Sequence, residues 1–246
     1  MWGEGGPQMP SSRFDITLPE LAFSVFVYRS MESFDVSLSQ LWECTGGEPD
    51  LLLKDHRQAL IRWLNQWGCR QFALEYHQVA SENLLSWYRD FGARLVAHGK
   101  HLWELNDDEL MAAGEAYAAL SKRVASLKDR DGKLLPVSIG PTGASKILFS
   151  LRPQVFVAWD GPIRRALGHN GGLDSYVKYL QQVRSSLENI EKICHANGFG
   201  LNELPHKLGS PESSLPKLIG EHLWVTLTRQ CAPPTSEVFH RWARWS

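Results

Sequence analysis

The segment from Asp174 to His195 constrains the fold more than any other part of this sequence. Its apolar residues recur at intervals of three and four positions, which is the period of one face of a helix. These residues are Tyr176, Val177, Leu180, Val183, Leu187 and Ile190. Because a helix with such an apolar face must bury it against other elements, we expect this segment to lie against a helical core.

Similar patterns predict helices in most of the remaining chain. A helix is expected from Lys54 to the stop at Gly68, and others at about 72–88, after the cap-like Asn106 and at about 216–230. A short strand or extended arm is expected in residues 14–27, and loops at 128–133 and 198–216. We therefore predict an all-α or nearly all-α fold of helical bundle domains around a cleft. Residues 1–13 would be a flexible leader, and 14–246 a single helical domain.

Composition narrows the class of protein. Hydrophobic residues make up 43% of the 246 residues, and ten residues are Trp, so the chain can bury a sizeable core. No run reaches the ~18–20 apolar residues that span a bilayer. The first ten residues have neither the basic nor the apolar part of a signal peptide. We therefore expect a cytoplasmic protein with no membrane partner.

Cysteine and histidine patterns argue against a metal site or a cofactor. The four cysteines are far apart in sequence and form no CxxC pair: Cys44, Cys69, Cys194 and Cys231. This spacing fits neither a zinc ribbon nor the ligand set of an iron–sulfur cluster, so we expect free thiols. No HExxH or other metal signature is present among the histidines.

Positive charge is concentrated in one part of the chain. The formal net charge is only −1, which argues against nucleic-acid binding by bulk electrostatics. Between positions 133 and 165, however, five basic residues accompany a single acid, Asp160. The five are Lys133, Lys146, Arg152, Arg164 and Arg165. We predict a local basic surface that contacts a few phosphates, with an ordinary solvated face as the alternative.

The same region contains a glycine-rich segment, Gly140-Pro141-Thr142-Gly143. We predict a turn there, followed by a helix that starts at Ala144. Backbone N–H groups at such a helix start have no intrahelical partner, and together with the helix dipole they can bind a phosphate without reading the base.

Asp160 stands in an unusual setting. It follows an apolar run, 155–159, and precedes Gly161-Pro162 and a short helix with Arg164 and Arg165. One interpretation is that Asp160 is the N-cap of the helix Pro162–Leu167. The other is that the carboxylate is catalytic, and capping does not exclude that role.

The order of these features resembles the helix-hairpin-helix DNA glycosylases, and in particular a divergent prokaryotic group with the pattern S-K, then P-x-x-F-x-x-W-D. The matching residues here are Ser145-Lys146, Pro153, Phe156 and Trp159-Asp160, within residues 134–167. The resemblance implies that Lys146 is the amine nucleophile and Asp160 the essential carboxylate. It also implies that a phosphate is held by Gly140, Thr142, Gly143 and Ser145.

The expected chemistry is the cleavage of an N-glycosidic bond of a base flipped out of double-stranded DNA. A carboxylate beside C1′ would stabilise the positive charge that develops on the sugar. Lys146 would need a depressed pKa to act as a nucleophile; if it stays charged and exposed, it is a phosphate contact instead. Candidate walls of the base pocket are Trp159, Asn65 and Arg70, and Arg164 and Arg165 are candidate DNA contacts.

Several functions remain open at this stage. The resemblance suggests an anti-phage enzyme that removes a bulky modified cytosine, such as glucosylated hydroxymethylcytosine. In support, the glycines lie three and six positions before Lys146, whereas a typical hairpin has them two and four before it. Alternatives are an oxidised-guanine repair glycosylase with lyase activity, a non-enzymatic DNA-binding module, and a helical protein-interaction subunit. We expect a monomer.

Overall fold

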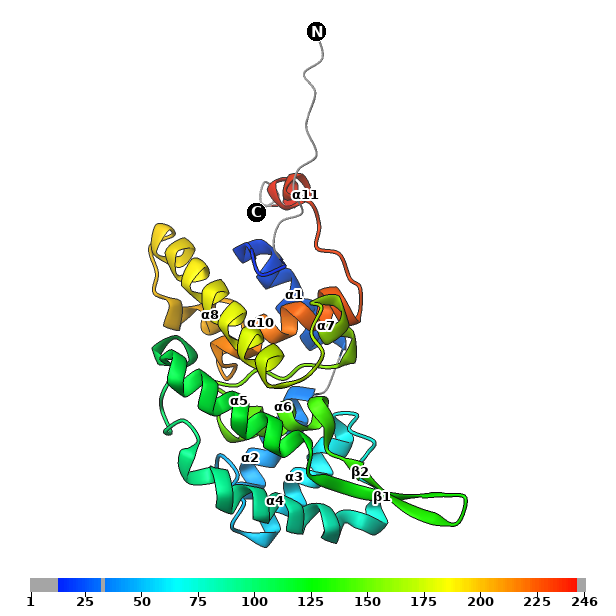
Figure 1. The fold of residues 1–246 in the computed structure, drawn as a ribbon. Helices are drawn as coiled ribbons and strands as arrows, with labels where there is room; N and C mark the ends of the chain where they lie inside the picture. The colour runs from blue at the N-terminus through cyan, green and yellow to red at the C-terminus, as the bar shows by residue number, and fades with distance from the viewer. Residues whose placement is uncertain (1–12, 32–33, 243–246) are drawn as a thin grey trace.

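The computed structural model describes residues 13–31 and 34–242, which form a mostly helical body with one small sheet (Figure 1). The α-helices are α1 (Leu18–Met31), α2 (Phe34–Thr45), α3 (Lys54–Gln66), α4 (His77–Phe91), α5 (Asp107–Ser121), α6 (Gly140–Leu151), α7 (Gly161–Ala166), α8 (Leu173–Ala196), α9 (Leu204–Lys207), α10 (Leu215–Leu223) and α11 (Ser236–Trp242). The strands are β1 (Val124–Arg130) and β2 (Lys133–Ser138). Short 3₁₀ segments are η1 (Leu74–Tyr76), η2 (Gly92–Arg94), η3 (Leu102–Glu104) and η4 (Leu201–Glu203), and η5 (Trp224–Thr228) is a π-helix that continues α10.

The long helix predicted from Asp174 is confirmed as α8, and the face predicted to be apolar is buried. α5 packs against both α8 and α6. A Cβ at Gly114 of α5 would lie 2.4 Å from Cγ2 of Val177 on α8, so only glycine allows the two helices to approach this closely. In Figure 1, α2–α4 gather at one end of the molecule and α1, α8 and α10 at the other, with α5 and α6 between them.

The prediction of a strand or extended arm in residues 14–27 is wrong. Residues 18–31 form α1, which buries Leu21, Val25 and Tyr28 at helical intervals. The leader predicted over 1–13 lies, apart from Arg13, outside the described residues.

The predicted loop at 128–133 is also wrong, because it belongs to a β-hairpin that follows the end of α5 at Ser121. Antiparallel strands β1 and β2 pair Arg130 with Lys133 across the two-residue turn Asp131-Gly132. Both turn residues have positive φ, 56° and 77°, as a type I′ turn requires. Figure 1 shows the hairpin extending away from the helices.

The glycine-rich segment is not a turn that precedes a helix. Residues 140–143 are the first turn of α6, with Pro141 at its N-terminus and a positive φ of 69° at Gly140. Strand β2, rather than another helix, leads into α6.

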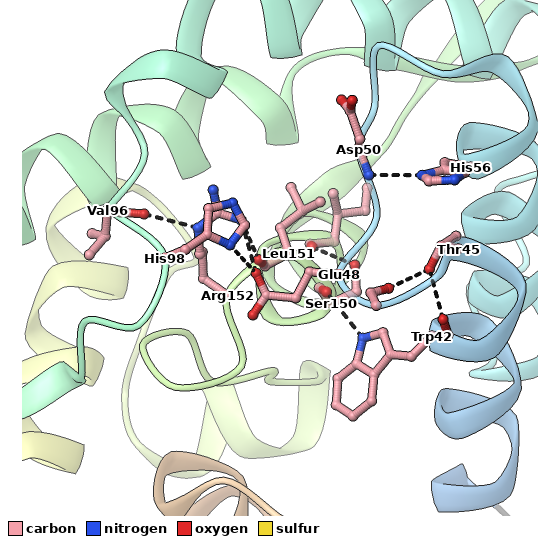
Figure 2. A network of polar contacts seen from close by, with 12 residues as sticks. Trp42, Thr45, Glu48, Asp50, His56, Val96, His98, Ser150, Leu151 and Arg152 are labelled. Carbon is pink, nitrogen blue, oxygen red and sulfur yellow. Dashed lines mark hydrogen bonds and ion pairs between the residues drawn. The ribbon is translucent and has the colours of Figure 1, made fainter.

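A polar network around Arg152 fixes the chain where α6 ends (Figure 2). The Arg152 guanidinium is buried, donates from Nε to the Val96 carbonyl oxygen at 2.9 Å and pairs with Glu48 at 3.2 Å. Glu48 also contacts His98, and Trp42 donates to the Ser150 carbonyl oxygen. Arg152 is therefore structural, and the predicted basic surface does not include it.

Among the residues that the structure describes, no helix combines the length and apolar character needed to cross a membrane.

Candidate active site

A cavity of about 330 Å³ lies where α6 and α10 meet the segment 157–161, a size within the range of small-ligand pockets. Its aromatic lining comes from six side chains: Tyr28, Phe34, Trp67, Phe149, Trp159 and Trp224. Its polar lining includes Thr142, Lys146, Asp160, Lys217 and Glu221. The structure thus brings the two predicted catalytic residues, Lys146 and Asp160, to one cavity.

Lys146 reaches the cavity from the middle of α6. Thr142 and Phe149, one turn away on either side, line the same cavity, as residues at intervals of three and four share a helix face. The ammonium donates a hydrogen bond to the carbonyl oxygen of Trp67 and lies 5.5 Å from the centre of the Trp67 ring. Trp67 is the C-cap of α3, so Lys146 satisfies one of the carbonyl groups left without a partner at that helix end.

Burial lowers the pKa of Lys146 below its ordinary value, because the charged ammonium loses water contact. Two nearby acidic groups oppose this effect: the thiol of Cys69 when it is ionised, and the carboxylate of Asp160. No ion pair within 4.0 Å joins the described side chains of Lys146 and Asp160. The amine is therefore more easily deprotonated than an exposed lysine, which is the condition for nucleophilic chemistry.

Asp160 is the N-cap of α7, as predicted from the sequence. Its Oδ1 accepts a hydrogen bond from the backbone N–H of Ile163 at 2.9 Å, and its Oδ2 accepts one from the hydroxyl of Thr228 at 2.8 Å. The carboxylate is thus held by one partner on each oxygen. Because it is partly buried and lines the cavity, a bound molecule can still contact it.

Helix ends favour the charges of both residues. Lys146 contacts the C-terminal end of α3, where the helix dipole favours a cation, and Asp160 caps the N-terminal end of α7, where it favours an anion. The cavity therefore contains a positive group, Lys146, and a negative group, Asp160, and a helix end fixes the position of each.

The part of the cavity lining that belongs to α10 carries further charged residues, Lys217 and Glu221. Lys217 contacts Asp35 at 2.8 Å and Glu221 on the next turn of its own helix, and lies 5.2 Å from the Tyr28 ring centre. Glu221 is only 2% exposed. Burial raises the pKa of Glu221, and its pairing with Lys217 partly opposes that shift.

Only one of the three residues predicted as walls of the base pocket lines the cavity. Trp159 lines the cavity, but it is 1% exposed and its ring packs among aromatic neighbours, at 4.9 Å from the centre of Tyr179 and 5.1 Å from Tyr176. Asn65 and Arg70 are exposed and are not part of the cavity lining. Asn65 instead donates to the carbonyl oxygen of Phe72, so neither residue is a pocket wall.

The predicted phosphate contacts are also only partly accessible. Gly140 and Thr142 are partly buried, whereas Gly143 and Ser145 are buried. The Ser145 hydroxyl donates to the Thr142 carbonyl oxygen and accepts from the backbone N–H of Trp159 at 3.2 Å. Ser145 therefore joins α6 to the segment that leads to Asp160, and it does not face a ligand.

Arg164 and Arg165 extend from α7 and do not line the cavity. Arg165 is exposed and Arg164 is partly buried. A Cβ at Gly171 would lie 2.5 Å from Nη1 of Arg164 and 3.0 Å from Cγ of Pro141. The last turn of α7 and the first turn of α6 thus meet beside Gly171.

Sequence reasoning missed most of the cavity walls, including Tyr28, Phe34, Lys217 and Glu221. One signal was present: Lys217 and Glu221 stand four positions apart within a mostly apolar segment, where charged residues need partners. A comparison of the chain with models of protein families, with curated proteins and with solved structures finds no match.

Proposed function

We propose that the protein is a DNA glycosylase that cleaves the N-glycosidic bond of a base flipped out of double-stranded DNA. The observation that carries this proposal is the joint placement of Lys146 and Asp160 in an aromatic-walled cavity. A flipped base needs such a cavity, because aromatic side chains replace the stacking that it loses on leaving the duplex.

In this reaction Asp160 faces the sugar. As the bond between C1′ and the base breaks, its electron pair leaves with the base and positive charge develops on the sugar. The Asp160 carboxylate stabilises that charge and orients the attacking group. Its contacts with Ile163 and Thr228 keep it in place, so little reorganisation is required during the reaction.

Lys146 has one of two roles in this reaction, depending on its protonation state. As a neutral amine, Nζ forms a bond with C1′ while the departing base takes up a proton, and loss of a proton from nitrogen with opening of the sugar ring then gives a Schiff base. As an ammonium ion, it contacts the departing base or a phosphate while water attacks C1′. The lowered pKa of Lys146 favours the amine.

DNA would approach from the side where α6 begins. Within this proposal, the start of α6 binds a phosphate without a preceding helix, through the backbone of Gly140 and Thr142. Arg164 and Arg165 add positive charge on the neighbouring α7. The proposed substrate is a bulky modified cytosine, such as glucosylated hydroxymethylcytosine, which would make the enzyme an anti-phage defence.

The test is to incubate the purified protein with duplexes carrying no modification, oxidised guanine or glucosylated hydroxymethylcytosine. Alkali reveals abasic sites, and borohydride traps a Schiff base. Base release from one duplex that is lost in Asp160→Asn supports the proposal and identifies the base. A trapped adduct that requires Lys146 assigns the nucleophile. Retention of DNA without release from any duplex would instead support a binding module.

A further inference from the structure

The polar wall formed by α10 has one feature that the proposed chemistry does not use. Lys217, Gly220, Glu221 and Trp224 recur at helical intervals and all line the cavity. They lie on elements other than those that carry Lys146 and Asp160. The proposed roles of Lys146 and Asp160 at the sugar therefore leave this wall available to contact the base.

The ammonium of Lys217 is held by three neighbouring groups. It donates hydrogen bonds to the hydroxyl of Ser213 at 3.1 Å and to Oε1 of Glu221, and it forms an ion pair with Oδ1 of Asp35 at 2.8 Å. Lys217 is also only 8% exposed. It thus acts as a fixed support for Glu221.

Glu221 has an acceptor without a partner. Oε1 contacts Lys217, whereas the buried Oε2 has no hydrogen-bond partner in the described part of the chain. A buried carboxylate oxygen without a donor is costly, and such groups in native proteins call for an explanation, a ligand among them. The surrounding charges, two carboxylates around one ammonium, favour a ligand that brings an N–H group.

We propose that Oε2 of Glu221 reads the exocyclic amine of the flipped base, so that the cavity selects a cytosine-type base over its counterpart with a carbonyl at the same position. Carboxylates accept hydrogen bonds from the N4 amine of cytosine in this way. The inference rests on the proposed glycosylase function and makes Glu221 a specificity-determining residue. A carbonyl at position 4 would place two acceptors against each other, which a buried site rejects strongly.

The test uses two matched duplexes, one with glucosylated hydroxymethylcytosine and one with glucosylated hydroxymethyluracil. At position 4 the cytosine derivative carries an amine and the uracil derivative carries a carbonyl. Only the uracil derivative has a proton on N3. The wild-type protein should release the cytosine derivative about 10- to 100-fold faster, the range of one hydrogen bond to a charged group. Glu221→Gln keeps the shape and Oε1 but places an amide N–H₂ where Oε2 was, so the preference should disappear or reverse.

Glu191→Gln is the matched control, because Glu191 is exposed on α8, outside the cavity. Thermal unfolding of both variants shows whether the fold is retained, and the wild-type preference tests the inference even if Glu221→Gln does not fold. Equal release of both bases by the wild type, an unchanged preference in folded Glu221→Gln, or release of oxidised guanine alone would overturn the inference while glycosylase activity stands. Failure of the wild type to release any base would overturn both.

Discussion

The hydroxyl of Thr228 donates to Oδ2 of Asp160 at 2.8 Å, across 68 positions of sequence. This contact ties the proposed catalytic carboxylate to the π-helix η5. We expect Thr228→Ala to lower kcat for base release about 10-fold, because the carboxylate loses one of the two contacts that orient it. Thr228→Ser should restore most of the rate. Thr226→Ala, which removes a hydroxyl bonded to the backbone of the same helix, should leave the rate unchanged in the same kinetic assay.

Asp160→Asn should abolish base release while the free energy of unfolding stays nearly unchanged. Asparagine is as good an N-cap as aspartate, so the free energy of unfolding should change by less than about 0.5 kcal/mol, whereas Asp160→Ala should cost about 1 kcal/mol. Base release should be lost in both variants, because neither provides a negative charge beside C1′. Denaturant unfolding and single-turnover release measure the two effects. Full activity of the folded Asn variant would leave Asp160 with a capping role only.

The pKa of Lys146 predicts a pH dependence for Schiff-base trapping. Burial lowers this pKa below the ordinary lysine value of 10.5, and only the neutral amine attacks. Trapping should therefore rise with pH and level off below pH 10.5. Lys146→Gln should abolish trapping at every pH, and Lys178→Gln, on α8 and outside the cavity, is the control. Trapping with no dependence on pH would contradict the assignment.

The same pKa shift affects stability in a defined direction. Between the depressed pKa of the folded protein and about 10.5, the unfolded chain holds a proton on Lys146 that the folded protein has lost. Stability from this group therefore increases as pH rises through that window. Urea unfolding of the wild type and of Lys146→Gln at a series of pH values should show that the variant lacks this increase.

Two glycines of the same loop can be compared to test how closely α6 and α7 pack. Gly168 and Gly171 both have positive φ, at 70° and 86°, but only a Cβ at Gly171 would collide with Arg164 and Pro141. Gly168→Ala should cost about 1 kcal/mol from backbone strain alone. Gly171→Ala should cost about 1–3 kcal/mol more, because the side chain has no space. Equal values in thermal unfolding would exclude the close packing described here.

Local signals in the sequence predicted several elements well. The apolar face of α8, the cap of α5 and the cap of α7 all depend on residues within a few positions of one another. Asn106 accepts from the backbone N–H of Glu109 at 2.9 Å, and Asp160 accepts from that of Ile163. Such contacts are determined by nearby residue types, so the sequence alone can predict them.

Two of the failed secondary-structure predictions have different causes. In α1 a short alternation of apolar residues resembled a strand, because the helix carries apolar residues on more than one face. For the hairpin, the signal of Asp131-Gly132 was present, but the strands have a weak apolar alternation, and Leu134 and Leu135 are both exposed. The buried residues of β1, Ala125 and Ser126, are adjacent and do not alternate with exposed ones, so the period-two pattern that marks a strand is absent.

The candidate site was predictable only in part. Lys146 and Asp160 are close in sequence and belong to one recognisable pattern. The walls around them come from α1, α2, the end of α3, α10 and η5, and only the tertiary packing of these elements brings them together. The same packing buries Arg152 and Ser145. Both were candidate binding residues in the sequence, and both have structural roles instead.

The wide turn of η5 also limits how this region can change in length. The backbone N–H of Arg229 donates to the carbonyl oxygen of Trp224, five positions earlier, so the helix accommodates one residue more than a regular turn would, as a single-residue insertion does. Deleting one residue within the wide turn would return this stretch to a regular α-helix, with the flanking residues close to their present directions. Lys217 and Glu221 precede that point, so such a deletion would leave them in place. We therefore expect homologous chains to differ in length by one residue in η5 more readily than within α10.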